Sequence, residues 1–289
     1  MLSLYGQELT EIDEANVSAV LKPTYAEIKD YLRVPLVNLV FRVLANYPEY
    51  LQLAWRQLRP NVQTMYFESR ADALRARAVE GMAGLDQAPV PSDPAITETL
   101  KVFHYVNPKL LLAVAALRAA TNGQYPRLEE LPAAEKRPIG RGIPEGMPNP
   151  ALIDPATASG RARQVFDAIM SAGSPVINTD YRALATWPEY LESAWQTVSP
   201  LRDRPEFRLL ERELRRITEE TILVMPFRVE INPHTMRLCG MGEPEIDGVR
   251  AILDRFYRLL PGLILNISFL ASGALGGQAT ASPYPPAAR

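Results

Sequence analysis

The sequence has few of the residues that support metal or redox chemistry. Its 289 residues include one cysteine, Cys239, and two histidines, His104 and His234. One cysteine cannot form a disulfide or a thiolate cluster within the chain, and neither histidine has a second ligand at helical spacing. We therefore expect no metal site and no cofactor. The low cysteine content also fits a reducing compartment.

Charge of one sign and long apolar runs are lacking too. The 31 basic and 33 acidic residues leave a formal net charge of -2, which argues against nucleic acid as a partner. The longest apolar runs, 110–117 and 259–275, are interrupted or flanked by Arg118, Asn266 and glycines, and fall short of a membrane span. The first sixteen residues have no basic stretch before an apolar one. We expect a cytoplasmic protein that does not bind membranes.

The sequence does contain one module written twice. An offset of 140 positions gives 12 identities in the 26 positions from Pro35 to Pro60, where residue frequencies predict about two. A weaker match has an offset of 153 and pairs Phe103 with Phe256 and Pro108 with Pro261. A segment rich in proline and glycine separates the copies. We predict a helical repeat at 1–127, a linker at 128–160 and a second repeat at 161–289.

The apolar residues inside each copy have helical spacing. Val37, Val40 and Leu44 fall on one helical stripe, and strand signals are scarce. Pro48 and Pro188 suit the first turn of a helix, and Thr24 and Thr186 each precede a glutamate at capping-box spacing. The sequence predicts an all-α fold in which two repeated helical domains pack as an internal pseudo-dimer.

Two polar residues interrupt the correspondence between the copies. Asp180 occupies the place of Val40 on an apolar stripe, so its carboxylate should point into the interior or a cleft. Asn107 occupies the place of Leu260. Structural alternatives stay open, because Asp180 could be a surface or capping carboxylate paired with Arg182. Asn107 could likewise cap a helix that begins at Pro108.

Six segments resemble the group I 2-haloacid dehalogenases, and the resemblance extends from about residue 24 to the last helix. The segments are YLRVP (31–35), RVLA (42–45), YPEYL (47–51), LAWR (53–56), NPK (107–109) and DYRALA (180–185). The resemblance implies an all-helical homodimeric hydrolase without metal or organic cofactor, which replaces the halogen of a 2-haloalkanoic acid by hydroxyl. It does not fix the enantiomer, the halogen or the chain length.

The resemblance also assigns roles to particular residues. It makes Asp180 the residue that activates water and Asn107 the residue that holds this water. Thr64 and Glu68 match a Thr-x-x-x-Glu pair implicated in the pocket, and Thr179 adjoins Asp180 in the expected pocket. Leu36 and Phe256 depart from the family pattern, which has an aromatic residue and a tyrosine at these places. We expect both departures to reshape the pocket.

Two mechanisms and one non-enzymatic function fit these residues. In the first mechanism Asp180 takes a proton from water, which attacks C2 directly. In the second, Asp180 itself attacks C2 and water then hydrolyses the ester. The non-enzymatic alternative is a helical protein that binds carboxylic acids without turnover. The presence of both Asp180 and Asn107 favours an enzyme.

Overall fold

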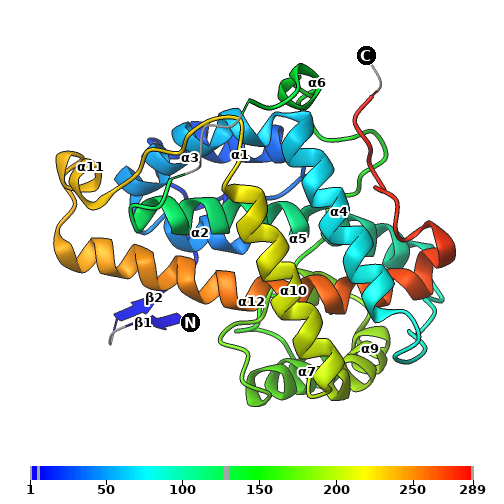
Figure 1. The fold of residues 1–289 in the computed structure, drawn as a ribbon. Helices are drawn as coiled ribbons and strands as arrows, with labels where there is room; N and C mark the ends of the chain where they lie inside the picture. The colour runs from blue at the N-terminus through cyan, green and yellow to red at the C-terminus, as the bar shows by residue number, and fades with distance from the viewer. Residues whose placement is uncertain (1, 5–6, 126–129, 288–289) are drawn as a thin grey trace.

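The computed structural model describes residues 2–4, 7–125 and 130–287 (Figure 1). Helices dominate the described residues, which confirms the all-α prediction. The first copy of the module supplies α1 (Lys22–Leu32), α2 (Leu39–Leu44), α3 (Pro48–Val62), α4 (Met65–Met82) and α5 (Pro94–Thr121). The second copy supplies α7 (Gly160–Ser171), α8 (Thr179–Leu184), α9 (Pro188–Leu201), α10 (Pro205–Ile222) and α12 (Glu243–Leu275).

Three of the five pairs of corresponding helices, α2 and α8, α3 and α9, and α4 and α10, begin at matching positions. At an offset of 140, α2 and α8 have the same bounds, as do α4 and α10. The remaining elements lie outside this correspondence. They are α6 (Ala133–Lys136), α11 (Pro233–Leu238), the 3-10 helix η1 (Gly276–Gln278) and the antiparallel strands β1 (Leu2–Leu4) and β2 (Gln7–Leu9). The sequence predicted neither the two short strands nor α6, which lies inside the expected linker at 128–160.

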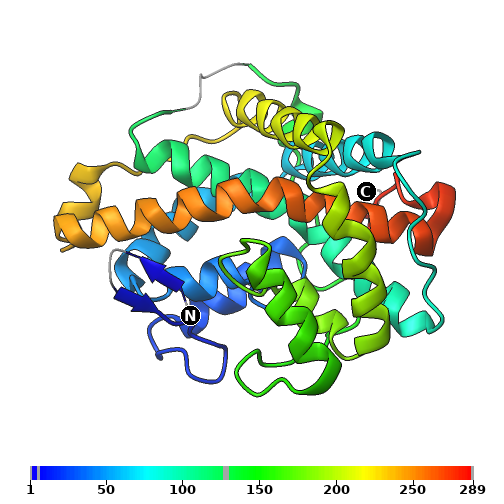
Figure 2. The same ribbon diagram turned by 90° about the horizontal axis from the view of Figure 1, so that it is seen from below.

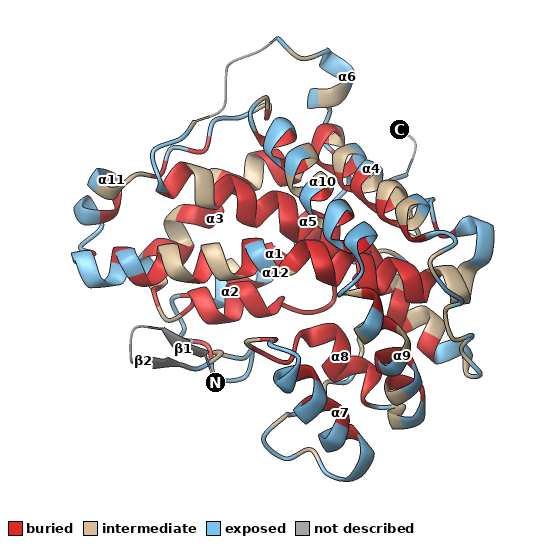
Figure 3. Ribbon diagram, turned by 60° about the horizontal axis from the view of Figure 1, so that its bottom comes forward, coloured by how far each residue is buried: buried red, intermediate tan, exposed pale blue. Residues whose placement is uncertain are grey.

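Helices α5 and α12 lie side by side through the centre of the molecule (Figure 2). Side chains from both copies contribute to the same apolar core around this pair, and α5 is buried along most of its length (Figure 3). Both helices are long and apolar enough to cross a membrane by length and composition alone. Within the protein, however, 94% of the apolar window of α5 and 67% of that of α12 are buried, as in core helices of globular proteins. The division into domains at 127 and 161 stays a prediction.

Helix α5 continues through Pro108, so Asn107 does not cap a helix that begins there. Proline has no N–H and leaves the carbonyl four residues earlier without its helical partner. The buried Arg75 of α4 replaces that partner, because its Nε donates to His104 O at 2.9 Å and its Nη2 to Tyr105 O at 3.2 Å. The helix therefore does not need to end at the proline.

The second copy has a similar contact, but it is made to the carbonyl three residues before its proline, not four. Helix α12 continues through Pro261, and Nη2 of Arg215 donates to the carbonyl oxygen of Arg258 at 3.0 Å. Arg215 is the counterpart of Arg75 at offset 140, and Pro261 is the counterpart of Pro108 at offset 153. The contact between Arg75 and Tyr105 O and the contact between Arg215 and Arg258 O are therefore related by the repeat.

The helix starts agree only in part with the sequence predictions. Pro48 and Pro188 begin α3 and α9 as expected. The two capping-box predictions are wrong, since Thr24 lies inside α1 and the residue that precedes α9 is Trp187. A proline in the first turn fixes the start of each of these helices without a side-chain cap.

Candidate active site

Asp180 and Asn107 meet at a cavity of about 20 Å³. We call it the Asp180 cavity. Its twelve lining residues form six pairs of repeat counterparts, with offsets of 140 or 153. The pairs are Asn38 and Asn178, Leu39 and Thr179, Val40 and Asp180, Phe103 and Phe256, Asn107 and Leu260, and Leu110 and Leu263. The cavity therefore lies where corresponding parts of the two copies face each other.

The side chain of Asp180 is held by two donors. It is the second residue of α8 and is 1% exposed. The backbone N–H of Tyr181 donates to Asp180 Oδ1 at 3.0 Å, and Asn107 Nδ2 donates to Asp180 Oδ2 at 3.3 Å. Arg182 instead pairs with Glu11 at 2.6 Å, which excludes the ion pair between Asp180 and Arg182 in this arrangement. The interior position predicted from the Val40 counterpart is confirmed.

Burial controls the protonation of Asp180. Loss of hydration raises its pKa from 3.8 to about 7, against the opposing effect of the bonds from Tyr181 and Asn107. A carboxylate with this pKa is a much stronger base than an exposed aspartate and is still largely ionised slightly above neutral pH. A cavity of about 20 Å³ holds one water molecule, and the polar groups beside it can orient that water.

Two of the five predicted pocket residues line the same cavity. Thr179 begins α8, and its hydroxyl accepts a hydrogen bond from Arg42 Nη2 at 3.3 Å. Phe256 lies on α12 and contributes an apolar wall. Arg42 also pairs with Glu11 at 3.2 Å. Glu11 thus bridges Arg42 and its repeat counterpart, Arg182.

The structure does not bring Leu36, Thr64 or Glu68 to the Asp180 cavity. Leu36 is buried in the apolar core. Thr64 caps α4, because its Oγ1 accepts from the N–H of Phe67 at 3.2 Å. Glu68 forms a buried ion pair with Lys109 at 2.6 Å. The geometry gives these residues structural contacts, and a direct role in the pocket stays a prediction.

Sequence reasoning missed the two asparagines of the cavity. Asn38 and Asn178 precede α2 and α8, and their identity in both copies favours a structural interpretation. Both are buried, and Asn38 Oδ1 has no hydrogen-bond partner. An unpartnered buried acceptor is costly, so this atom is suited to accept a hydrogen bond from water or a ligand. The repeat could have predicted both asparagines, because every lining residue lies within one helical turn of Asp180, Asn107 or one of their two repeat counterparts.

The fold and the site define a class of protein: an all-α chain with a repeated module and a buried carboxylate beside a water-sized cavity. No group of three or more histidine, cysteine, aspartate or glutamate side chains suited to a metal ion occurs among the described residues. The family model "Halocarboxylic acid dehydrogenase DehI" matches residues 35–127. This match includes Asn107 and ends before Asp180.

Relatives with assigned names cover most of the chain. A Pseudomonas sp. (strain 113) protein named "2-haloacid dehalogenase, configuration-inverting" is 31% identical over 229 residues, 73% of this chain and 74% of its own length. A protein of the same name from Alcaligenes xylosoxydans xylosoxydans is 29% identical over 97% of this chain and 98% of its own. An "(R)-2-haloacid dehalogenase" from Pseudomonas putida is 24% identical over 91% and 92%. The chain belongs to the 2-haloacid dehalogenase family.

A solved structure confirms the fold independently. The complex of a D-2-haloacid dehalogenase with L-LA superposes with a TM-score of 0.87 at 24% identity. The match covers 95% of this chain and 99% of the other one.

Proposed function

We propose that the protein hydrolyses short 2-haloalkanoic acids to 2-hydroxyalkanoic acids. One observation supports this function most strongly: a buried Asp180 with a pKa near 7 and Asn107 share a cavity that fits a water molecule. The names of the relatives place their substrates in the same chemical class.

In the proposed mechanism, water attacks C2 directly. Asp180 accepts one proton from the water while the C2–O bond forms on the side opposite the halogen. The C2–halogen bond breaks at the same time, and its electron pair leaves with the halide. Asn107 orients the water and the carboxylate of Asp180 for attack on C2. Positioning of this kind lowers the activation barrier by several kcal/mol, with an upper limit of roughly 7–11 kcal/mol.

The substrate needs more room than the Asp180 cavity offers. A cavity of about 20 Å³ holds the attacking water only. Leu110, Leu260 and Leu263 form part of its wall, and rotation of such side chains would admit the alkyl group and the halogen. The apolar wall would then exclude bulk water from the reacting atoms.

The same residues could act through an ester of Asp180. The word "inverting" in the relatives' names does not decide between the two mechanisms, because each includes a single displacement at C2. A single turnover in ¹⁸O-water with enzyme in excess decides it. Direct attack places ¹⁸O in the hydroxyl of the product. The ester mechanism instead places ¹⁸O in the Asp180 carboxylate and leaves the first product unlabelled.

Halide release from each enantiomer of 2-chloropropionate tests the function itself. We expect release by the parent protein and almost none by Asp180→Asn, since an amide cannot accept the proton. Release by neither the parent nor the variant, with both enantiomers and with bromo analogues, would refute the proposal. It would leave the alternative of a protein that binds carboxylic acids without turnover.

We also propose a cytoplasmic homodimer that binds neither nucleic acid nor membranes. The nearly balanced charge supports the absence of nucleic acid, and the burial of α5 and α12 supports a globular protein. The family resemblance supports the dimer. Light scattering coupled to gel filtration tests it, and a mass near the 32.2 kDa of one chain would contradict it.

A further inference from the structure

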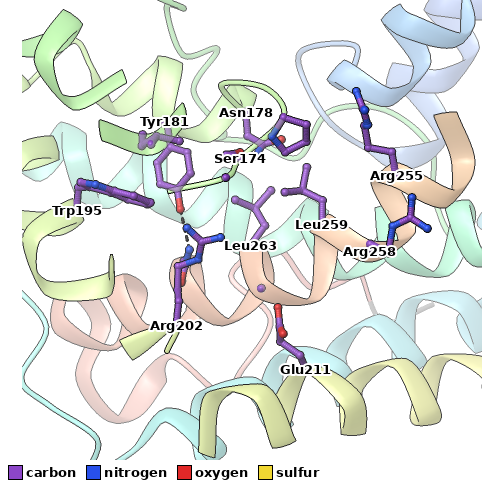
Figure 4. Close-up of a pocket in the computed structure, with 15 residues that line it drawn as sticks. Ser174, Asn178, Tyr181, Trp195, Arg202, Glu211, Arg255, Arg258, Leu259 and Leu263 are labelled. Carbon is purple, nitrogen blue, oxygen red and sulfur yellow. Dashed lines mark hydrogen bonds between the residues drawn. The ribbon is translucent and has the colours of Figure 1, made fainter. Parts of the chain in front are cut away.

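A second cavity of about 320 Å³ adjoins the Asp180 cavity (Figure 4). Its size falls in the range of small-molecule sites. It is lined by residues from α7 to α12 and shares Asn178 and Leu263 with the Asp180 cavity. These two side chains therefore form the wall between the cavities. We call the larger one the access pocket.

The access pocket is positively charged. Arg202, Arg255 and Arg258 line it together with one carboxylate, Glu211, so it has a formal excess of two positive charges. The guanidinium of Arg202 lies 5.6 Å from the centre of the Trp195 ring and takes part in none of the ion pairs found among the described residues. Its charge is thus available to an anion in the pocket.

A buried polar pair lines the inner end of the pocket. Asn266 Nδ2 donates to the hydroxyl of Tyr181 at 2.8 Å, and Asn266 Oδ1 is buried without a partner. In Figure 4 the dashed line at the hydroxyl of Tyr181 marks this hydrogen bond. The two ends of an amide are interchangeable by rotation. In the rotated state Tyr181 donates to Oδ1, and the N–H groups of Asn266 are free to donate to an anion.

Long side chains occupy the corresponding positions in the first copy of the module. The counterparts of Gly173 and Gly262 are Arg33 and Lys109, whose long side chains are buried against Glu68. Arg33 even has the left-handed backbone of Gly173, with φ values of 62° and 84°. The counterparts of the three pocket arginines are Val62, Val102 and Tyr105. The fold of the module therefore requires neither the hollow nor its positive charge.

We propose that the access pocket binds the carboxylate of the incoming 2-haloacid and delivers the substrate past Asn178 and Leu263 to Asp180. This inference rests on the proposed function. The substrate is an anion, and a cleft with excess positive charge raises the rate at which anions arrive. Arg202 and the amide of Asn266 would hold the carboxylate, while Leu263 faces the halogenated carbon.

A competing route has the wrong charge. Another cavity, of about 480 Å³, shares Leu39 with the Asp180 cavity. Its charged lining residues are Glu11, Asp154, Arg163, Asp167 and Arg182. Three carboxylates against two arginines leave a formal excess of one negative charge, which would repel a 2-haloacid.

Steady-state kinetics test the route. Arg202→Gln and Arg258→Gln should each raise KM and lower kcat/KM about tenfold, with kcat within about twofold of the parent. The remaining kcat/KM should depend less on ionic strength, because screening acts on the charge that was removed. Arg216→Gln is the matched control: Arg216 is exposed on α10, pairs with Glu220 and carries the same charge.

Binding tests the pocket without turnover. Trp195 lines the pocket, so its fluorescence in Asp180→Asn should change saturably with propionate and 2-chloropropionate, but not with propionamide. The fluorescence change should disappear when Trp195→Phe is added to Asp180→Asn. Adding Arg202→Gln to Asp180→Asn should weaken the affinity for these acids about tenfold. This measurement retains its meaning even if no 2-haloacid is turned over, so it separates failure of the pocket from failure of the proposed function.

Three outcomes would overturn the inference. One is that Arg202→Gln and Arg258→Gln keep the kcat/KM of Arg216→Gln. Another is that Arg163→Gln, on the competing route, raises KM instead. The third is that bromide saturates the Trp195 signal while propionate does not, which would make the pocket an exit for halide. Arg258 is exposed, so its variant should fold even if Arg202→Gln does not.

Discussion

Replacing Asp180 by asparagine should stabilise the protein above neutral pH while it abolishes halide release. Burial raises the pKa of Asp180 from 3.8 to about 7. Each pKa unit corresponds to about 1.4 kcal/mol, so the ionised carboxylate lowers the stability of the folded state by roughly 4 kcal/mol. An amide of the same shape avoids this penalty, and Asn107 can rotate its own amide to keep the hydrogen bond.

The stability difference between Asp180→Asn and the parent should depend on pH. The pKa of Asp180 is higher in the folded than in the unfolded state, so the folded state binds more protons between about pH 4 and 7. The stability that this proton provides is complete below about pH 4 and is lost as the pH rises through about 7. The amide of the Asp180→Asn variant does not titrate in this range. The advantage of the variant should therefore grow from near zero at acid pH to roughly 4 kcal/mol at about pH 8.

Urea unfolding followed by circular dichroism between about pH 5 and 8 measures this difference. Asp167→Asn serves as the control, because Asp167 is exposed and pairs with Arg163 at the surface. We expect the control to follow the parent within about 0.5 kcal/mol at each pH. Parallel stability curves for Asp180→Asn and the parent, or a variant less stable than the parent at about pH 8, would refute the reasoning.

The same geometry supports four further predictions. The kcat/KM for 2-chloropropionate should rise with pH through about 7, as Asp180 loses its proton, and a flat profile from about pH 5 to 8 would contradict a base with this pKa. Asn107→Ala should lower kcat strongly and leave the urea midpoint of unfolding nearly unchanged. Trp195→Ala should instead lower the free energy of unfolding by about 3–5 kcal/mol in urea titrations. Arg75→Met should cost about 1–3 kcal/mol for each carbonyl that it leaves unpaired, and Arg215→Met less, because Arg215 is only half-buried. Halide release should persist after dialysis against a chelator, and activity that returns only on addition of a metal ion would contradict this.

Much of the architecture was predictable because helical spacing and the repeat are local signals. The apolar stripe of Val37, Val40 and Leu44 predicted a helix here, but α2 begins only at Leu39, after Val37. Pro48 and Pro188 placed the starts of α3 and α9. The alternative that Asn107 caps a helix was wrong. It assumed that a helix begins at Pro108, because proline is usually unfavourable in the interior of a helix. Arg75, which satisfies the two carbonyls, lies 29 and 30 residues before them in the sequence, and no local pattern predicts that contact.

The site was predictable to the extent that asymmetry between the copies marks it. Asp180 and Asn107 differ from their counterparts, and the structure brings their side chains together. Asn38 escaped notice because it is identical in both copies, although its side chain lines the cavity. Identity between copies therefore indicates shared structure without excluding function. The placement of Glu68 against Lys109 depends on tertiary packing, which spacing does not encode.

The pairing of counterparts around the Asp180 cavity has a consequence for symmetry. In a dimer of identical modules, a cavity on the two-fold axis would receive the same residue from both sides. Two aspartates at the places of Val40 and Asp180 would repel each other and share one proton at neutral pH. Two valines would leave no base at all. Joining the modules in one chain allows each side of the axis to change alone, so a single base can face an apolar wall.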